Sequence, residues 1–276
     1  MPDGVGTNDS CSIISSDIEW KFLANAISRQ GALPGIQLSS VWNTYDGIRR
    51  FIPKSPDEQA ANYKRIGSQI TAREALAAFD SLNKATELAI SAGFRHLQVH
   101  AAHGYLFNLL IDPELSSHSD LTIGRLTKWA NELRLEGYET SLRFSMWAGH
   151  EIFDANRGYS LIDKLALIPV DFLDASAGFY NIDKRLIYPS APAILQQRLS
   201  MTLDIANRLP EINVISSGLS SNAWNGNLPN NVHIGICRDL IANPDYLLER
   251  GNGCTMCMKC HYFSRKEKHL TCGKWN

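Results

Sequence analysis

Three polar residues with rings lie close together in the segment Phe-Arg-His-Leu-Gln-Val-His-Ala-Ala-His-Gly-Tyr-Leu, which begins at Phe94. They are His100, His103 and Tyr105. Imidazole N–H groups can donate hydrogen bonds to a carbonyl or phenolate oxygen, and a phenol can protonate a carbon that becomes carbanion-like after hydride attack. A core histidine beside two turn residues is the alternative interpretation, and a metal-binding pair would need Asp112 as its carboxylate ligand. The residue types alone leave these alternatives open.

A second candidate for chemistry is the C-terminal segment, which holds four of the six cysteines. They are Cys254, Cys257, Cys260 and Cys272. Four thiolates are the number that a [4Fe–4S] cluster or a structural zinc ion needs, and the spacing does not choose between the two. Cysteines gathered at one end favour metal binding in a reducing compartment over a disulfide framework, with unligated thiols as the remaining alternative.

Short β-like segments that alternate with helix-like ones must position these residues. This alternation predicts βαβ units and a parallel sheet, and 276 residues suit one α/β barrel, which needs roughly 250. The clearest helix is Thr71–Ala92, with Thr71 and Glu74 as a capping box, and less regular helices are expected near Leu121–Leu135, Pro192–Arg208 and Leu240–Arg250. The predicted strands are Leu33–Leu38, Arg95–His100, Thr140–Ser145, Phe172–Ser176, Asn213–Ser216 and Val232–Ile236.

Composition and charge exclude several classes of function. A formal net charge of -1, with 27 basic and 28 acidic side chains, provides no electrostatic surface for nucleic acid or an anionic membrane. No apolar segment approaches the roughly 20 residues of a membrane helix, and the first ten residues lack the features of a signal peptide. We therefore expect a cytoplasmic protein that binds a small molecule, and neither nucleic acid nor a membrane.

The segment Ala92–Pro113 closely resembles the central segment of the Old Yellow Enzyme family, which includes NADH:flavin oxidoreductases and 2,4-dienoyl-CoA reductases. The resemblance implies a TIM-type (β/α)8 barrel and an FMN-dependent oxidoreductase that transfers hydride to or from an activated C=C bond. It further implies that His100 and His103 hold the electron-withdrawing oxygen of the substrate and that Tyr105 donates the proton. The flavin is expected to be reduced by NAD(P)H or through the cysteine cluster, and the absence of a GxGxxG segment fits members of the family that bind the nicotinamide over the flavin itself.

Further segments resemble the flavin-contact segments of the family in the same order. The resemblance implies that Gln37 contacts the flavin pyrimidine and that Arg143 lies beside flavin N1, where a cation stabilises the reduced flavin. A capped strand end and a surface ion pair are the alternatives for these two residues. The remaining expected cofactor contacts, at later strand ends and in the phosphate site, are Ser176, Gly178, Gly218, Gly235 and Arg238.

The sequence also departs from the family, which it resembles over roughly residues 30–276. The first strand of the family has no counterpart before Ser10, so we expect a barrel that is incomplete at its N-terminus and is covered by a partner chain or a homo-oligomer. Cys237 replaces the glycine that usually precedes the phosphate-binding arginine. The expected division is a shortened barrel over residues 1–253 and a four-cysteine segment over residues 254–276.

The cysteine spacing resembles the iron–sulfur segment of dienoyl-CoA reductases and trimethylamine dehydrogenase, which favours [4Fe–4S] over zinc. Two other hypotheses remain beside the flavoenzyme. One is a degenerate barrel that serves as a subunit or binding module and keeps the cluster for structure or electron transfer. The other is a zinc-stabilised hydrolase that uses the histidines as bases, which no accompanying carboxylates support.

Overall fold

The computed structural model describes residues 13–40, 55–180, 182–219, 226–249, 251–260 and 268–275. Within these ranges, six parallel strands form one sheet in the order β1-β2-β3-β4-β5-β6. The strands are β1 (Gly35–Leu38), β2 (His96–Ala101), β3 (Glu139–Ser145), β4 (Phe172–Ser176), β5 (Asn213–Ser216) and β6 (Val232–Ile234). Each pairs with its neighbour in the sequence, as repeated βα units require.

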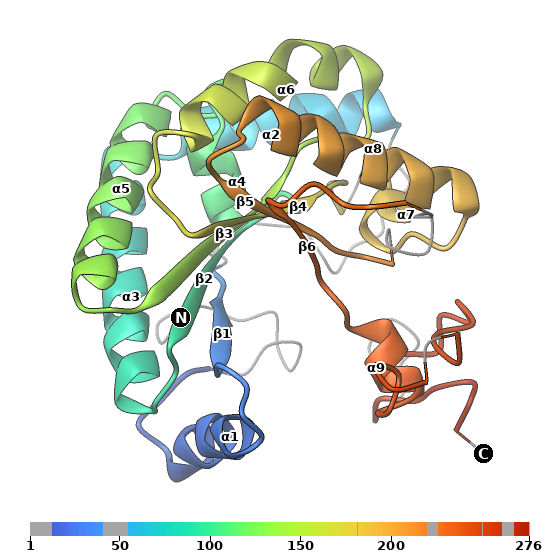
Figure 1. Ribbon diagram of the computed structural model, residues 1–276. Helices are drawn as coiled ribbons and strands as arrows, with labels where there is room; N and C mark the ends of the chain where they lie inside the picture. Colours follow the sequence, from blue (N-terminus) through green and yellow to red (C-terminus); the bar gives the residue numbers. More distant parts are fainter. Residues whose placement is uncertain are drawn as a thin grey trace.

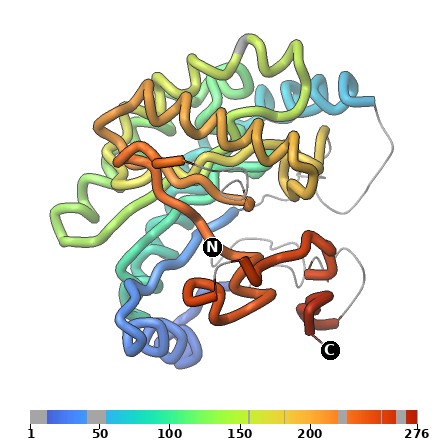
Figure 2. The backbone as a smooth tube through the Cα atoms, turned by 45° about the vertical axis from the view of Figure 1, so that its right-hand side comes forward, coloured from blue at the N-terminus to red at the C-terminus, as the bar shows by residue number. Residues whose placement is uncertain are grey.

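The helices lie mainly on one side of a curved sheet (Figure 1). Helix α1 lies below β1, whereas α9 and the C-terminal segment lie below β6, on the other side of the opening that the sheet partly encloses (Figures 1 and 2). The helices are α1 (Ile18–Arg29), α2 (Pro56–Gln69), α3 (Ala72–Ser91), α4 (Leu106–Ile111), α5 (Ser119–Leu135), α6 (Glu151–Leu165), α7 (Lys184–Ile187), α8 (Pro192–Arg208) and α9 (Arg238–Ala242). None of them combines the length and apolar character needed to cross a membrane.

The structure confirms all six predicted strands, and it confirms the helix and capping box that begin at Thr71. The predicted helix Leu240–Arg250 is wrong, because α9 ends at Ala242 and turns follow it. Asn243 and Pro244 come directly after that end, and a residue before proline is disfavoured in a helical conformation. The expected absence of a strand before Ser10 lies outside the described residues.

The strands alternate between an apolar and a polar face. Leu97, Val99 and Leu142 are fully buried in the core that the helices cover. The intervening residues form a hydrogen-bonded polar row across the opposite face, because Gln98 Nε2 donates to Ser141 Oγ at 3.0 Å and Ser217 Oγ donates to Asp174 Oδ1 at 3.0 Å. The sheet therefore resembles part of a barrel wall that packs helices outside and directs polar groups inside.

A fully buried arginine joins three elements behind the ends of the strands. Arg157 of α6 donates through Nε to Asp112 Oδ2 at 2.6 Å, and both side chains are fully buried. Its terminal nitrogens donate to the carbonyl oxygens of Ser145 and Met146, at 3.1 and 3.0 Å. These bonds, named the Arg157 clamp, fix the end of β3 against the end of α4. Helix α4 follows directly after the histidine segment.

Asp112→Asn should destabilise the fold strongly, because it removes the closer and fully buried of the two carboxylates that neutralise Arg157 and leaves only Asp154, at 3.3 Å. The free energy of unfolding, measured by urea denaturation, should fall by roughly 3 kcal/mol. Glu132→Gln is the matched control, since its exposed pair with Lys128 should contribute less than about 1 kcal/mol. Equal losses in the two variants would show that the clamp does not stabilise the fold.

Candidate functional site

The predicted site residues gather where the strands end. His100 is on β2 and pairs in register with Arg143 on β3, which in turn pairs with Asp174 on β4. Ser176 is the last residue of β4, and Gly178 lies two residues beyond it. Parallel strands bring their carboxyl ends to one edge of the sheet, so the topology assembles these side chains as the sequence predicted.

The three rings of the histidine segment form one cluster. The ring centroid of His100 lies 5.6 Å from that of His103 and 4.9 Å from that of Tyr105. All three side chains are buried, with exposed fractions of 8% or less. Nδ1 of His100 has no hydrogen-bond partner among the described residues. A buried ring nitrogen without a partner is unusual in a folded protein and is the kind of group that a ligand satisfies.

His103 is held from several sides in a left-handed backbone conformation, with φ at 62°. Its backbone N–H donates to Ser145 Oγ at 2.9 Å, and its ring Nδ1 lies 2.9 Å from the carbonyl oxygen of Gly178. A carbonyl can only accept, so Nδ1 carries the proton and Nε2, which lies 3.4 Å from Ser176 Oγ, is the acceptor. The fixed ring of His103 therefore orients Ser176 at the end of β4.

The turn after His103 depends on a glycine. Gly104 has φ at 81°, and a Cβ there would lie 2.6 Å from the ring of the buried Tyr63 on α2. Its N–H donates to Asn108 Oδ1 at 2.8 Å, which ties the turn to α4. Only glycine combines this backbone conformation with this close approach. The turn brings Tyr105 back beside His100.

Both histidines are neutral at physiological pH. Burial, with a further contribution from the positive charge of Arg143, lowers the pKa of His100 from its ordinary value of 6.5 to about 3. The same two causes, in the same order, lower the pKa of His103 well below 6.5. The rings therefore act as dipolar hydrogen-bonding groups and not as cations.

Arg143 is paired with a buried carboxylate. Its Nη1 lies 3.5 Å from Asp174 Oδ2, and the side chain of Asp174 is only 6% exposed, so the ion pair is largely buried on its acidic side. Nε of Arg143 is buried and has no hydrogen-bond partner among the described residues. Arg143 thus offers a charged donor beside His100.

The sequence analysis missed Arg198, a fully buried arginine on α8. Its Nη1 donates to the carbonyl oxygen of Leu186 at 2.9 Å, whereas its Nε has no partner among the described residues. Burial, followed by repulsion from Arg143, lowers its pKa to about 10. A signal was available, because Arg198 interrupts an apolar stripe that contains Leu195, Leu199 and Ile205.

The predicted phosphate-site residues lie around this arginine. Gly218 follows β5 with φ at 78°, and a Cβ on it would lie 2.9 Å from Cζ of Arg198. Arg238 donates through Nη2 to the carbonyl oxygens of Pro189 and Gly218, at 3.0 and 3.2 Å. Gly235 packs closely on Ser217, whose Oγ would lie 2.4 Å from an added Cβ. The site therefore has three arginines, at positions 143, 198 and 238.

Two predicted contacts lie differently from the rest of the cluster. The side chain of Gln37 is exposed and hydrogen-bonds to Gln98 on the neighbouring strand β2. Cys237, the residue before α9, is also exposed. The exposure of Cys237 means that this side chain does not fill the space among the buried arginines.

The sequence analysis also missed the roles of two tyrosines. Tyr180 lies beside the histidine segment, with ring centroids 5.9 Å from His103 and 6.0 Å from Tyr105. Its hydroxyl oxygen lies 2.8 Å from that of Tyr188. The four-residue helix α7 brings Tyr180 and Tyr188 together, and so short a helix leaves no periodic pattern in the sequence.

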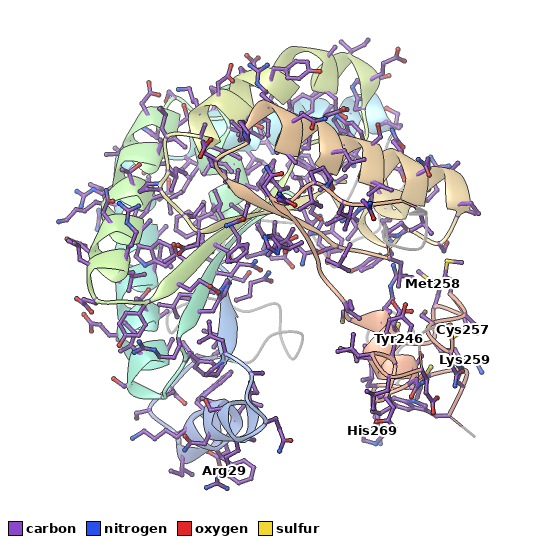
Figure 3. All side chains as sticks on the ribbon, viewed as in Figure 1. Arg29, Tyr246, Cys257, Met258, Lys259 and His269 are labelled. Atoms are coloured by element: carbon purple, nitrogen blue, oxygen red, sulfur yellow. The ribbon has the colours of Figure 1, made fainter. Side chains whose placement is uncertain are left out.

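The four C-terminal cysteines lie in segments 251–260 and 268–275, whose described residues form no helix or strand, and Cys257, Met258 and Lys259 lie at the side of this region (Figure 3). Sγ of Cys254 accepts a hydrogen bond from the N–H of Met256 at 3.2 Å, and Sγ of Cys272 accepts from Lys274 at 3.5 Å. Backbone N–H groups of Lys259 and Gly273 lower the pKa of Cys257. Across the described residues, however, no group of three or more potential ligand side chains is arranged to hold a metal ion.

These observations define the class of protein as a parallel α/β barrel-type fold with a buried polar site at its strand ends. Residues 1–131 match the family described as NADH:flavin oxidoreductase / NADH oxidase. The match begins at residue 1, about thirty residues before the resemblance inferred from the motifs. The probable NADH-dependent flavin oxidoreductase YqiG of Bacillus subtilis is 30% identical over 107 residues, which is 36% of this chain and 27% of that protein.

Solved structures share the fold. The 2-naphthoyl-CoA reductase complex superimposes with a TM-score of 0.62 at 16% identity, covering 94% of this chain and 45% of that one. The 6-hydroxypseudooxynicotine amine oxidase of Pseudomonas geniculata N1 gives 0.58 at 16% identity, covering 93% and 42%. Old Yellow Enzyme from Pichia sp. AKU4542 gives 0.53 at 15% identity, covering 87% and 68%.

The first half of the chain is thus similar to the NADH:flavin oxidoreductase / NADH oxidase family, and the fold is shared with Old Yellow Enzyme. The prediction of a TIM-type barrel fold is confirmed, and the described residues contribute six parallel strands to it. The chain spans only 27% of the curated relative and 42% to 45% of two of the structural neighbours.

The buried neutral histidines should make folding stability sensitive to acid. Below pH 6.5 the unfolded chain protonates His100, whereas the folded chain does so only near pH 3. The contribution of the neutral ring to the free energy of unfolding is therefore complete above pH 6.5 and is lost as the pH falls toward 3. His100→Gln should therefore reduce the slope of unfolding free energy against pH, by up to about 1.4 kcal/mol per pH unit. Urea denaturation at several pH values between those limits measures this slope. The exposed His269→Gln should leave the slope unchanged, and an equal change in both variants would contradict the assignment.

Proposed function

We propose that the chain is an FMN-dependent oxidoreductase that transfers hydride to or from an activated C=C bond of a small molecule. The observation that carries this proposal is a set of buried donors without partners among the described residues, His100 Nδ1, Arg143 Nε and Arg198 Nε, at the carboxyl ends of the strands. The match of residues 1–131 to the NADH:flavin oxidoreductase / NADH oxidase family supports the proposal. The reaction direction is left open by this set of residues.

The residues present fit FMN. Arg198 and Arg238, with the glycine turn at Gly218, provide two guanidinium groups and close backbone approach, which suit a phosphate dianion. Arg143 offers a charged donor nearer to the histidines, where it would stabilise a reduced flavin ring. Bound FMN would supply the hydride acceptor and donor. Ser176, Gly178, Gly235 and Gln37 complete the proposed set of cofactor contacts.

The histidine cluster would hold the substrate. His100 would donate a hydrogen bond to the electron-withdrawing oxygen of the substrate, because its ring is neutral and its Nδ1 is unsatisfied. His103 would act on the same substrate oxygen chiefly by orienting its neighbours, because its Nδ1 is directed at the carbonyl oxygen of Gly178. Tyr105, 4.9 Å from the ring of His100, would transfer a proton to the substrate carbon.

We further propose a [4Fe–4S] cluster on Cys254, Cys257, Cys260 and Cys272, with zinc as the alternative. Backbone N–H groups already point at three of the four sulfurs, and such bonds stabilise thiolates that carry negative charge. Metal loading would draw the four cysteines together, since the described arrangement does not gather three ligands. NAD(P)H is the proposed electron donor in a cytoplasmic setting, and a partner chain or second copy would cover the open sheet.

A second candidate function is a degenerate barrel that acts as a subunit or binding module. Gln37 favours it, because this proposed flavin contact is already hydrogen-bonded to Gln98. The open sheet favours it as well, since among the described residues β1 pairs only with β2 and β6 only with β5. Such a protein would bind no flavin and would purify with a second chain.

The proposed function is tested by an anaerobic absorbance spectrum of the purified protein, followed by addition of NADH and an α,β-unsaturated ketone. Flavin absorbance near ~450 nm should bleach on reduction and return when the ketone is added. Tyr105→Phe should retain the flavin and its bleaching but slow the return by at least ~100-fold, because the general acid is lost. A flavin-free protein with a second chain would support the degenerate subunit instead.

The cluster is tested by iron, zinc and sulfide analysis of anaerobically purified protein. Cys257→Ser should lose most of the bound metal, because one of four thiolate ligands is removed. Cys237→Ser should retain it, because Cys237 is exposed and lies outside the proposed set. Equal metal contents in the two variants would contradict the assignment of Cys257 as a ligand.

A further inference from the structure

Three tyrosine hydroxyls form a chain that leads away from the histidine cluster. Tyr180 hydrogen-bonds to Tyr105 through its side chain, and its hydroxyl lies 2.8 Å from that of Tyr188. The rings of Tyr180 and Tyr188 meet edge to face at 6.2 Å, as do those of Tyr105 and Tyr180 at 6.0 Å. The three phenols come from the start of α4, the turn after β4 and the residue after α7. The fold therefore assembles the chain from separate segments.

The hydroxyls of the chain hold their protons. Burial is the main cause that raises the pKa of Tyr180 to about 12. Burial is also the main cause that raises the pKa of Tyr188, and the hydrogen bond with Tyr180 contributes. Either oxygen of the Tyr180–Tyr188 pair can be the donor. Both phenols are therefore protonated at physiological pH, and the chain can pass a proton toward Tyr105.

The chain also runs from a buried to a less buried residue. Tyr105 is 8% exposed, whereas Tyr180 and Tyr188 are half-buried. A buried proton donor that acts in every turnover needs a path by which its proton is replaced. Hydroxyls are suited to such a path, because each can accept one proton while it donates another.

We propose that Tyr180 and Tyr188 form a proton relay that resupplies Tyr105 from solvent. This inference rests on the proposed function, in which Tyr105 protonates a substrate carbon. In the step, the Tyr105 O–H bond breaks as a C–H bond forms at the carbon, and the lone pair of the carbanion-like centre becomes that bond. Tyr105 takes the hydroxyl proton of Tyr180, Tyr180 takes that of Tyr188, and Tyr188 takes one from water. One proton enters and one reaches the carbon, so each phenol ends neutral.

Coupling along the chain can be measured without turnover by NMR of protein that carries 13C at the tyrosine ζ carbons. Tyr188→Phe should shift the resonances of both Tyr180 and Tyr105, because removing the first donor changes polarisation along the whole chain. Tyr159→Phe is the matched control, since Tyr159 is exposed on α6 and stacks on Arg208. A Tyr105 resonance that is unchanged in Tyr188→Phe would overturn the relay.

Repeated turnover provides the second readout, measured as the steady-state rate at which NADH reduces an unsaturated ketone. Tyr188→Phe and Tyr180→Phe should lower this rate by about 10-fold or more and leave the ketone Kd unchanged, whereas Tyr159→Phe should change neither. An active wild-type protein with an unaffected rate in Tyr188→Phe would overturn the relay alone. A wild-type protein that reduces no unsaturated ketone would overturn both the proposed function and the relay.

Discussion

The buried carboxylate of Asp174 is the interaction on which the polar face of the sheet depends. From the middle of β4 it accepts hydrogen bonds from Gln98 on β2, at 3.4 Å, and from Ser217 after β5, at 3.0 Å. It also pairs with Arg143 on β3 at 3.5 Å. A buried carboxylate is stable only when its lone pairs are satisfied, so this residue fixes four neighbouring segments in one register. The same charge offsets part of the repulsion among the arginines.

Arginine charge then determines the chemistry of the strand ends. Arg143 contributes to the low pKa values of both histidines, and it repels Arg198 across the site. Neutral imidazoles and cationic guanidiniums therefore lie side by side, an arrangement that suits an anionic cofactor next to a neutral, oxygen-bearing substrate. The Arg157 clamp behind the end of β3 keeps these groups in place when no ligand is bound.

The sequence predicts the parts of the molecule that local patterns encode. The six strands follow from short apolar segments with alternating faces, and the helix after Thr71 follows from its capping box. The gathering of His100, Arg143 and Ser176 follows from parallel topology alone. The sequence could not predict which buried arginine completes the site, because Arg198 lies on a helix whose packing angle brings it under Gly218. Nor could it predict the phenol chain, which depends on the turn that carries Tyr180 back beside Tyr105.

We propose that these strand ends bind FMN through their arginines. The test is a titration of flavin-depleted protein with FMN, in which binding is measured by the quenching of flavin fluorescence. It compares the variant Arg198→Met with the control Arg95→Met, because Arg95 lies outside the site, on the ring of Tyr138. We predict saturable 1:1 binding by the wild-type protein and by Arg95→Met. Arg198→Met should bind FMN at least ~10-fold more weakly. Absence of saturable FMN binding by the folded wild-type protein would contradict the claim.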